Sequence, residues 1–191
     1  MIETIRLQTW IDAPVERCFL LSLSVDLHLA STSRTLEHTI DGVTTGLIGE
    51  GESVTFRARH LGRWWQHTSR IEALRPCSYF RDVMVAGAFR RFEHDHHFAP
   101  MDDGTRMRDE IHFSAPWGVP GQILARRLLL QVLKERNSHI KQVAESEEWR
   151  NYLDASVEVS LPLPADGSVR RWDPNGLLKN SGIAVPPPPQ N

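Results

Sequence analysis

Two histidines and a carboxylate, spaced as on facing strands, are the residues of this chain best suited to chemistry. His94 and His96 stand two positions apart, and Asp109 follows a turn-like Met-Asp-Asp-Gly segment at positions 101–104. Side chains two positions apart on a strand point to the same face of the sheet. A turn at 101–104 places Asp109 opposite His96, and a register shifted by two places it opposite His94. The sequence therefore predicts an apolar strand face that carries two histidines and a carboxylate.

Three kinds of chemistry are open to this group. In a structural network, Asp109 accepts a hydrogen bond from His96 while Arg136 neutralises the carboxylates. As acid–base groups, His94, His96 and Asp109 could move protons in a cyclisation, dehydration or hydrolysis. With His67 or Asp109, the two histidines could also bind zinc or another divalent ion. Because there is no helical His-Glu pair, cysteine ligand or nucleotide-binding fingerprint, we expect a polar pocket wall with neither metal nor cofactor.

A second pair of strands sorts its residues in the same way. A tight hairpin at positions 61–62 pairs Phe56 with His67 and turns both to one face of the sheet. In this register Trp65 shares the inner face with His67, and Trp64 points away from the interior.

The elements around these hairpins follow from periodicity and from helix and strand breakers. Residues 5–11 alternate as an opening strand, two short helices are expected within 12–33, and further strands at 34–40, 52–61 and 79–85. The longest helical segment is expected at 121–152, with a stripe that comprises Leu128, Leu129, Val132, Leu133, Ile140, Val143 and Ala144. Arg136 interrupts this stripe. Since a buried guanidinium needs anionic partners, we expect Asp82, Asp109 or the carboxylate of a bound ligand to supply them, with a structural ion pair favoured over ligand capture.

Composition limits the class of protein. The chain has 191 residues and a formal net charge of −2 without a long basic run, so nucleic acid is not an expected partner. No apolar run approaches the ~20 residues needed to span a bilayer. Cys18 and Cys77 lie in no metal or redox spacing, so we expect reduced cysteines and a cytoplasmic protein. One domain is expected at 1–154, followed by a Pro/Gly-rich, loosely ordered tail at 155–191.

The order of these elements resembles the helix-grip fold of the SRPBCC superfamily, which includes START domains, plant pollen-allergen-like proteins and aromatic polyketide cyclases. Residues 1–149 are similar to bacterial ligand-binding SRPBCC proteins through five short features: Phe80-x-Asp82, Gly87-Ala88-Phe89, Phe92-x-His94-x-His96-x-Phe98, Gly104-Thr105-x-Met107-x-Asp109 and Arg136. The resemblance implies an α+β fold. A curved antiparallel sheet of about seven strands wraps around a long C-terminal helix, and two short helices follow the first strand.

The resemblance also implies a ligand in a cavity between the sheet and the long helix. The sorting of faces given above names the expected ligand-binding residues: Phe56, Trp65, His67, Phe80, Asp82, Met84, Phe92, His94, His96, Phe98, Met107, Asp109, Ile111, Phe113 and Arg136. Mostly apolar walls with a few polar groups are typical of small-molecule sites, so a small hydrophobic or amphipathic ligand is expected. The alternative is a cyclase- or dehydratase-type enzyme that uses His94, His96 and Asp109. A third hypothesis is a protein that binds a partner through its Pro-rich tail.

Overall fold

The structure, a computed structural model, describes residues 2–32, 36–60, 63–153, 169–171 and 179–181. Its main strands are β1 (Glu3–Ile11), β2 (His38–Gly42), β3 (Ser53–His60), β4 (Arg63–Arg75), β5 (Tyr79–Ala86), β6 (Arg91–Met101) and β7 (Gly104–Ser114). Its helices are α1 (Val15–Leu23), α2 (Val25–Ser31), α3 (Gly118–Ala144) and the 3-10 helix η2 (Glu147–Asn151). Two short strands, β8 (Val169–Arg171) and β9 (Lys179–Ser181), pair with each other.

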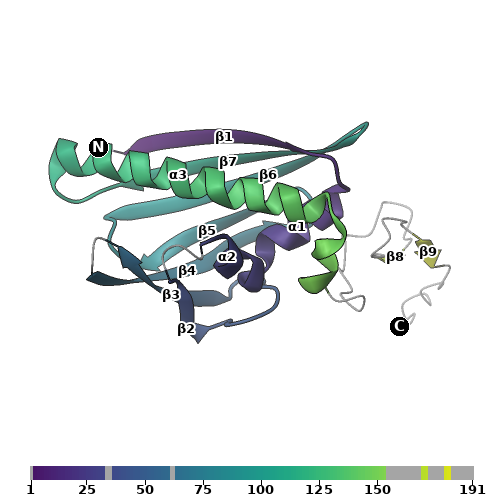
Figure 1. Ribbon diagram of the computed structural model, residues 1–191, viewed down its shortest axis with the longest axis horizontal. Helices are drawn as coiled ribbons and strands as arrows, with labels where there is room; N and C mark the ends of the chain where they lie inside the picture. Colours follow the sequence, from purple (N-terminus) through teal and green to yellow (C-terminus); the bar gives the residue numbers. More distant parts are fainter. Residues whose placement is uncertain (1, 33–35, 61–62, 154–168, 172–178, 182–191) are drawn as a thin grey trace, which may run out of the picture.

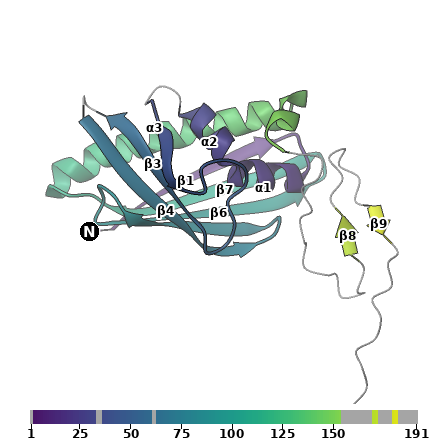
Figure 2. The ribbon, with the colours of Figure 1, turned by 90° about the horizontal axis from the view of Figure 1, so that it is seen from below.

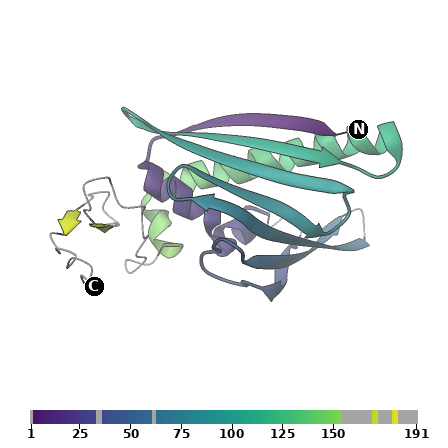
Figure 3. The same cartoon turned by 180° about the vertical axis from the view of Figure 1, so that it is seen from behind.

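The seven main strands form one antiparallel sheet in the order β1-β7-β6-β5-β4-β3-β2. The first strand of the chain therefore pairs with the last strand before α3. All three α-helices lie on one face of this sheet, and α3 runs along it (Figures 1 and 2). Figure 3 shows the opposite face of the sheet in front of them. This is the helix-grip arrangement that the order of elements in the sequence predicts.

The predicted register of the β6–β7 hairpin is confirmed. His96 pairs with Asp109 and His94 with Ile111. The turn depends on Gly104, whose φ of 146° is a backbone conformation that side chains with a Cβ rarely adopt. A Cβ added there would also lie 2.2 Å from the carbonyl oxygen of residue 11.

The predicted register of the β3–β4 hairpin is confirmed as well. Phe56 pairs with His67. Trp64 is 46% exposed, whereas Trp65 is half-buried, as expected if only the second tryptophan points to the inner face. Two independent hairpins therefore sort their side chains as the period of two requires.

The helices differ from the sequence prediction mainly at their ends. Ser24 caps α2, because its hydroxyl oxygen accepts a 3.2 Å hydrogen bond from the Leu27 amide. The long helix ends at Ala144 rather than continuing to 152. Ser146 has extended backbone angles and caps η2 by accepting from the Glu148 amide, so the chain turns there into a separate short helix.

The apolar stripe of α3 is narrower than predicted. Leu133, Ile140, Val143 and Ala144 are buried. Leu128 and Val132, which were expected on the buried stripe, are 46% and 38% exposed. The helix packs along β1, α1 and α2, so only one side of it is covered.

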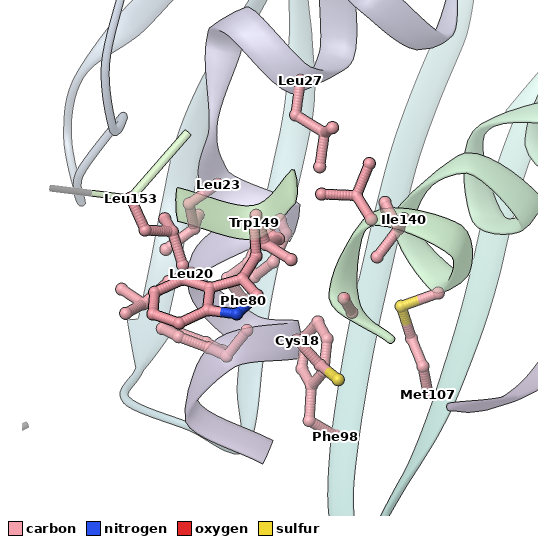
Figure 4. Packing of buried hydrophobic residues seen from close by; sticks show 14 of the residues in the cluster. Cys18, Leu20, Leu23, Leu27, Phe80, Phe98, Met107, Ile140, Trp149 and Leu153 are labelled. Atoms are coloured by element: carbon pink, nitrogen blue, oxygen red, sulfur yellow. The ribbon is translucent and has the colours of Figure 1, made fainter. Parts of the chain in front are cut away.

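The interior contains two separate apolar clusters. The larger cluster joins α1, the sheet, α3 and η2 (Figure 4), and includes Ile11, Phe19, Phe80, Phe98, Met107, Ile140, Trp149 and Leu153. The smaller cluster lies toward the other end of the sheet and consists of Ile5, Ile111, Phe113, Ala115, Ala125 and Leu133. Partly buried residues packed against the smaller cluster are Leu7, Phe89, Phe92, Leu129 and Leu130.

The predicted tail at 155–191 lies outside the described residues, apart from the backbone of β8 and β9. The described core reaches to Leu153, which is 2% exposed. No helix in the described part of the chain is long and apolar enough to cross a membrane.

Candidate functional site

A layer of polar side chains separates the two apolar clusters. Six elements contribute to it, and on β1, β6, β7 and α3 the polar residues stand between positions that belong to the two clusters. On β6, for example, His94 and His96 stand between Phe92 and Phe98. We call this set the polar layer, and its members are Thr9 of β1, Ser69 of β4, Asp82 of β5, His94 and His96 of β6, Asp109 of β7, and Arg136 and Asn137 of α3. Strand periodicity thus brings together polar groups from across the sheet.

Asp109 stands at the centre of the polar layer and is fully buried. Its Oδ1 lies 3.0 Å from Nε2 of His94 and 3.0 Å from Nδ1 of His96. Its Oδ2 accepts a 2.7 Å hydrogen bond from the Asn137 amide. The predicted closeness of His96 and Asp109 is therefore found, although the hydrogen bond itself is made by His94.

Asp82 faces the same two histidines from the other side. Its Oδ2 lies 2.9 Å from Nε2 of His96 and 3.7 Å from Nδ1 of His94. The Ser69 hydroxyl donates a 2.9 Å hydrogen bond to its Oδ1. The two imidazole rings, 3.7 Å apart between centroids, thus lie between two carboxylates, each of which contacts both rings.

Arg136 enters the layer from α3, as the sequence predicted. Its Nη1 lies 3.6 Å from Oδ1 of Asp109, and the guanidinium also donates to the Asn137 side-chain oxygen and to the carbonyl of Ser22. Asn137 was not singled out from the sequence. A signal for it was present, because residues 133, 137, 140 and 144 follow one side of a helix and Asn137 is the polar member of that set.

The electrostatics of the layer follow from burial and from these contacts. Burial alone would raise the pKa of the Asp82 and Asp109 carboxyls, but hydrogen bonding to the histidines holds both pKa values below their ordinary range. Burial and the neighbouring His96 lower the pKa of His94, while Asp109 opposes that shift. Near pH 7 the layer therefore combines two ionised carboxylates with a neutral His94.

The other residues predicted to bind a ligand, outside the polar layer, fall into three groups. Phe56, Phe80, Phe98 and Met107 belong to the larger cluster, and Ile111 and Phe113 to the smaller one. Trp65, His67, Met84 and Phe92 form the third group, because they point to the inner face of the sheet but are only half-buried. Within it, the ring of His67 meets Phe92 edge to face at 5.6 Å.

Two hollows lie near or behind the polar layer. A cavity of about 10 Å³ between α1, α2 and α3 touches Ser22, His28 and Arg136, which is room for roughly one water molecule. An open groove of about 460 Å³ lies on the outer face of the sheet around Tyr79, Arg81, Asp95, His97 and His112. Arg81 and Tyr79 donate hydrogen bonds to the Asp95 carboxylate there, so these polar groups of the groove are paired with one another.

The chain matches no family model and no curated protein. It is similar to solved structures of low sequence identity. The Zhui aromatase/cyclase from Streptomyces sp. R1128 is 14% identical, with a TM-score of 0.57 over 82% of this chain and 99% of that one. The di-domain ARO/CYC StfQ from the steffimycin biosynthetic pathway is 12% identical, with a TM-score of 0.62 over 78% of this chain and 52% of that one.

A third similar structure is Ara h 8.0201, which is 12% identical with a TM-score of 0.55 over 73% of this chain and 98% of that one. At such identities the likeness shows the fold. The chain therefore has the helix-grip fold that its sequence predicted. The fold does not by itself assign an activity, because one fold serves many functions.

Proposed function

We propose that this protein binds a small, largely hydrophobic molecule on the inner face of the sheet, beside the polar layer. The observation that carries the proposal is a contrast within that face. Phe80 and Phe98 are buried in the larger cluster, whereas Trp65, Met84 and Phe92 on the same face are half-buried. Partly open apolar side chains next to a few buried polar groups are typical of a small-molecule site.

The long helix supports the same location. Leu128, Val132 and Arg136 are spaced by four residues, so they follow one side of α3. Arg136 reaches the buried polar layer, while Leu128 and Val132 are 46% and 38% exposed. The side of α3 that reaches the polar layer therefore continues as an exposed apolar stripe, which the apolar part of a ligand would cover.

The proposed ligand is expected to lie at the part of the inner face that carries the half-buried Trp65, Met84 and Phe92, which we call the half-open end. The hollow beside Arg136 holds roughly one water molecule, which is too little for an organic ligand. The connection between β5 and β6 borders the half-open end, because a Cβ added at Gly87 would lie 2.6 Å from the Met84 sulfur and 3.0 Å from Nδ1 of His67. Hydrogen bonds to the polar layer would orient the ligand, and burial of apolar surface against the half-buried side chains would supply its affinity.

A matched pair of variants tests the proposal. Met84 points to the inner face, and the next residue, Val85, is 58% exposed on the other face. We expect the wild-type chain to bind the apolar fluorescent probe 1-anilinonaphthalene-8-sulfonate in its folded state. Met84→Arg should weaken this binding at least tenfold, and Val85→Arg should leave it unchanged. Equal affinity of both variants would contradict the proposed location.

An enzyme of the cyclase or dehydratase type is the second candidate function. The observation that favours it is the neutral His94, which lies 3.0 Å from an ionised Asp109 and can act as a general base. Two of the similar structures are described as an aromatase/cyclase and an ARO/CYC protein. With an identified ligand as substrate, Asp109→Asn should then keep ligand affinity but sharply lower turnover. Partner binding through the tail at 155–191 stays a prediction from the sequence.

A further inference from the structure

We propose that Asp82, His94 and His96 form a binding site for a divalent transition-metal ion, with zinc as the representative ion. Each of these residues offers one ligand atom, and the three atoms lie within 4.8 Å of one another. Oδ2 of Asp82 is 2.9 Å from Nε2 of His96 and 3.7 Å from Nδ1 of His94. Zinc bonds of about 2.0–2.2 Å at tetrahedral angles place neighbouring ligand atoms roughly 3.3 Å apart. The two observed separations, 2.9 and 3.7 Å, lie on either side of this value.

The orientation of the two rings favours metal binding on the Asp82 side. Each imidazole turns one nitrogen toward Asp82 and the other toward Asp109, whose Oδ1 is 3.0 Å from both rings. A histidine that binds a metal commonly gives its other ring N–H to a carboxylate, which fixes the tautomer and the direction of the ring. Asp109 accepts such a hydrogen bond from His94 at 3.0 Å, lies equally close to the outer nitrogen of His96, and is itself held by the Asn137 amide at 2.7 Å.

A second observation indicates that the arrangement is incomplete with protein groups alone. Nδ1 of His96 makes no hydrogen bond within the described part of the chain, although the residue is only 2% exposed. The Asp109 oxygen lies within 3.0 Å but outside the direction in which a ring N–H donates. Buried polar atoms are nearly always paired, so a ring nitrogen without a hydrogen bond beside carboxylate acceptors needs an explanation. An ion bound by the opposite nitrogen of the same ring would reorient it.

The charges around Asp82 and the exposure of its side chain also favour a bound cation. Within the described part of the chain, the ion-pair partners of Asp82 are His94 and His96. Arg136 contacts Asp109 instead, so the cluster sets two carboxylates against one guanidinium. A divalent cation would compensate the second carboxylate. The Asp82 side chain is 18% exposed while that of Asp109 is fully buried, so an ion would enter from the Asp82 side.

This proposal differs from the expectation drawn from the sequence, where the lack of a helical His-Glu pair and of a cysteine ligand argued against a metal. The three-dimensional arrangement adds Asp82 as a third ligand and places Asp109 3.0 Å from the outer nitrogen of each histidine. The proposal goes beyond ligand binding on the inner face and does not depend on it, since the ion can be tested in the absence of any organic molecule.

The test is a calorimetric titration of the full chain, stripped of metal by a chelator and dialysed, with zinc chloride alone. We expect one zinc ion per chain. Asp82→Asn and His96→Gln should each lower the affinity by at least about 100-fold, and Asp109→Asn by about 10–100-fold, as is typical when the partner of a metal-binding histidine is changed. His97→Gln is the matched control, because His97 lies on the same strand but faces the outer groove. It should bind zinc like the wild type.

Two readouts keep the test decisive if a variant folds poorly. Circular dichroism of each metal-free variant reports whether it is folded. Cobalt bound to the wild-type chain should give the intense visible absorption of a four-coordinate ion, which needs no variant. Absence of zinc binding by the folded wild-type chain would overturn the proposal and leave the cluster as a proton-based network. Equal zinc affinity in Asp82→Asn and His97→Gln would overturn it too, because the ion would then be bound elsewhere.

Discussion

Asn137 on α3 donates a hydrogen bond of 2.7 Å to Oδ2 of Asp109 on β7, and both side chains are buried. The same amide group lies 3.1 Å from the hydroxyl oxygen of Thr9 on β1. One side chain of the long helix therefore contacts two strands through directed polar bonds. Apolar contacts constrain direction less, so this contact fixes how α3 sits on the sheet between the two apolar clusters.

Replacing this asparagine should therefore reduce stability. Asn137→Leu leaves an oxygen of the buried Asp109 carboxylate without its donor, and we expect a loss of about 1–3 kcal/mol in the free energy of unfolding, measured in urea. The control is Ser138→Leu, which also replaces a polar side chain with leucine, but at a neighbouring position that is exposed. A loss in Ser138→Leu as large as that in Asn137→Leu would contradict the role given to the asparagine.

Arg136 should behave as the partner of a buried ion pair. Arg136→Met leaves Asp109 without its nearest guanidinium and is expected to cost about 3–5 kcal/mol in the free energy of unfolding. Combining it with Asp109→Asn should cost less than the sum of the two single changes, because the second change removes the charge that the first one exposes. Strictly additive losses in urea unfolding would show that the two residues do not interact.

Acid should destabilise the protein in two stages. Below the ordinary histidine pKa of 6.5, the unfolded chain binds protons that His94 and His67 do not bind in the folded chain, since desolvation lowers the pKa of both there. Below 3.8, the unfolded chain also protonates carboxyls whose folded pKa is lowered, Asp82 and Asp109. In both stages the unfolded state gains more protons, so stability must fall as pH falls.

Urea unfolding of the metal-free chain at a series of pH values measures this effect. We expect the free energy of unfolding to decline already between about pH 7 and 5 and to decline further below about pH 4. His94→Gln should flatten the first stage. A free energy of unfolding that rises on acidification from pH 7 to 5 would contradict the buried, neutral state assigned to His94.

The C-terminal boundary of the core offers a fourth prediction. Leu153 is 2% exposed within the larger cluster, so Leu153→Ala should cost about 2–5 kcal/mol. Removing residues 155–191 should leave the melting temperature nearly unchanged, because β8 and β9, the described strands of this segment, pair with each other and not with the seven-stranded sheet. Differential scanning calorimetry of both variants measures the contrast. A large drop on truncation would show that the tail is part of the fold.

The sequence was sufficient to predict the sheet and much of the polar layer because strand periodicity is strict. Once the turns at 61–62 and 101–104 were recognised, every side chain of four strands was assigned to a face, including His94, His96 and Asp109. A helix has no comparable constraint on which side is covered. Leu128 and Val132 continue the apolar pattern of α3, yet they are exposed because the helix leans on β1, α1 and α2.

Side-chain contacts between strands were harder to predict than the face of the sheet to which each side chain points. The position of Asp82 relative to His96 depends on the β5–β6 register, which sets Asp82 opposite His94 and Phe80 opposite His96. The connection between these strands, residues 87–90, has no short turn motif that would reveal this register. For the same reason, the contact of each histidine with two carboxylates could not be predicted from the sequence. That arrangement depends on side-chain direction across three strands at once.

Native mass spectrometry of the protein purified from its own host tests the central claim, ligand binding on the inner face, most directly. We expect the wild-type chain to carry a small organic molecule that dissociates on activation in the gas phase. The same adduct should persist in Val85→Arg and be lost in Met84→Arg, which places a charge among the half-buried apolar side chains. A wild-type spectrum showing only the bare chain, or the same adduct in equal amount on Met84→Arg, would contradict the account.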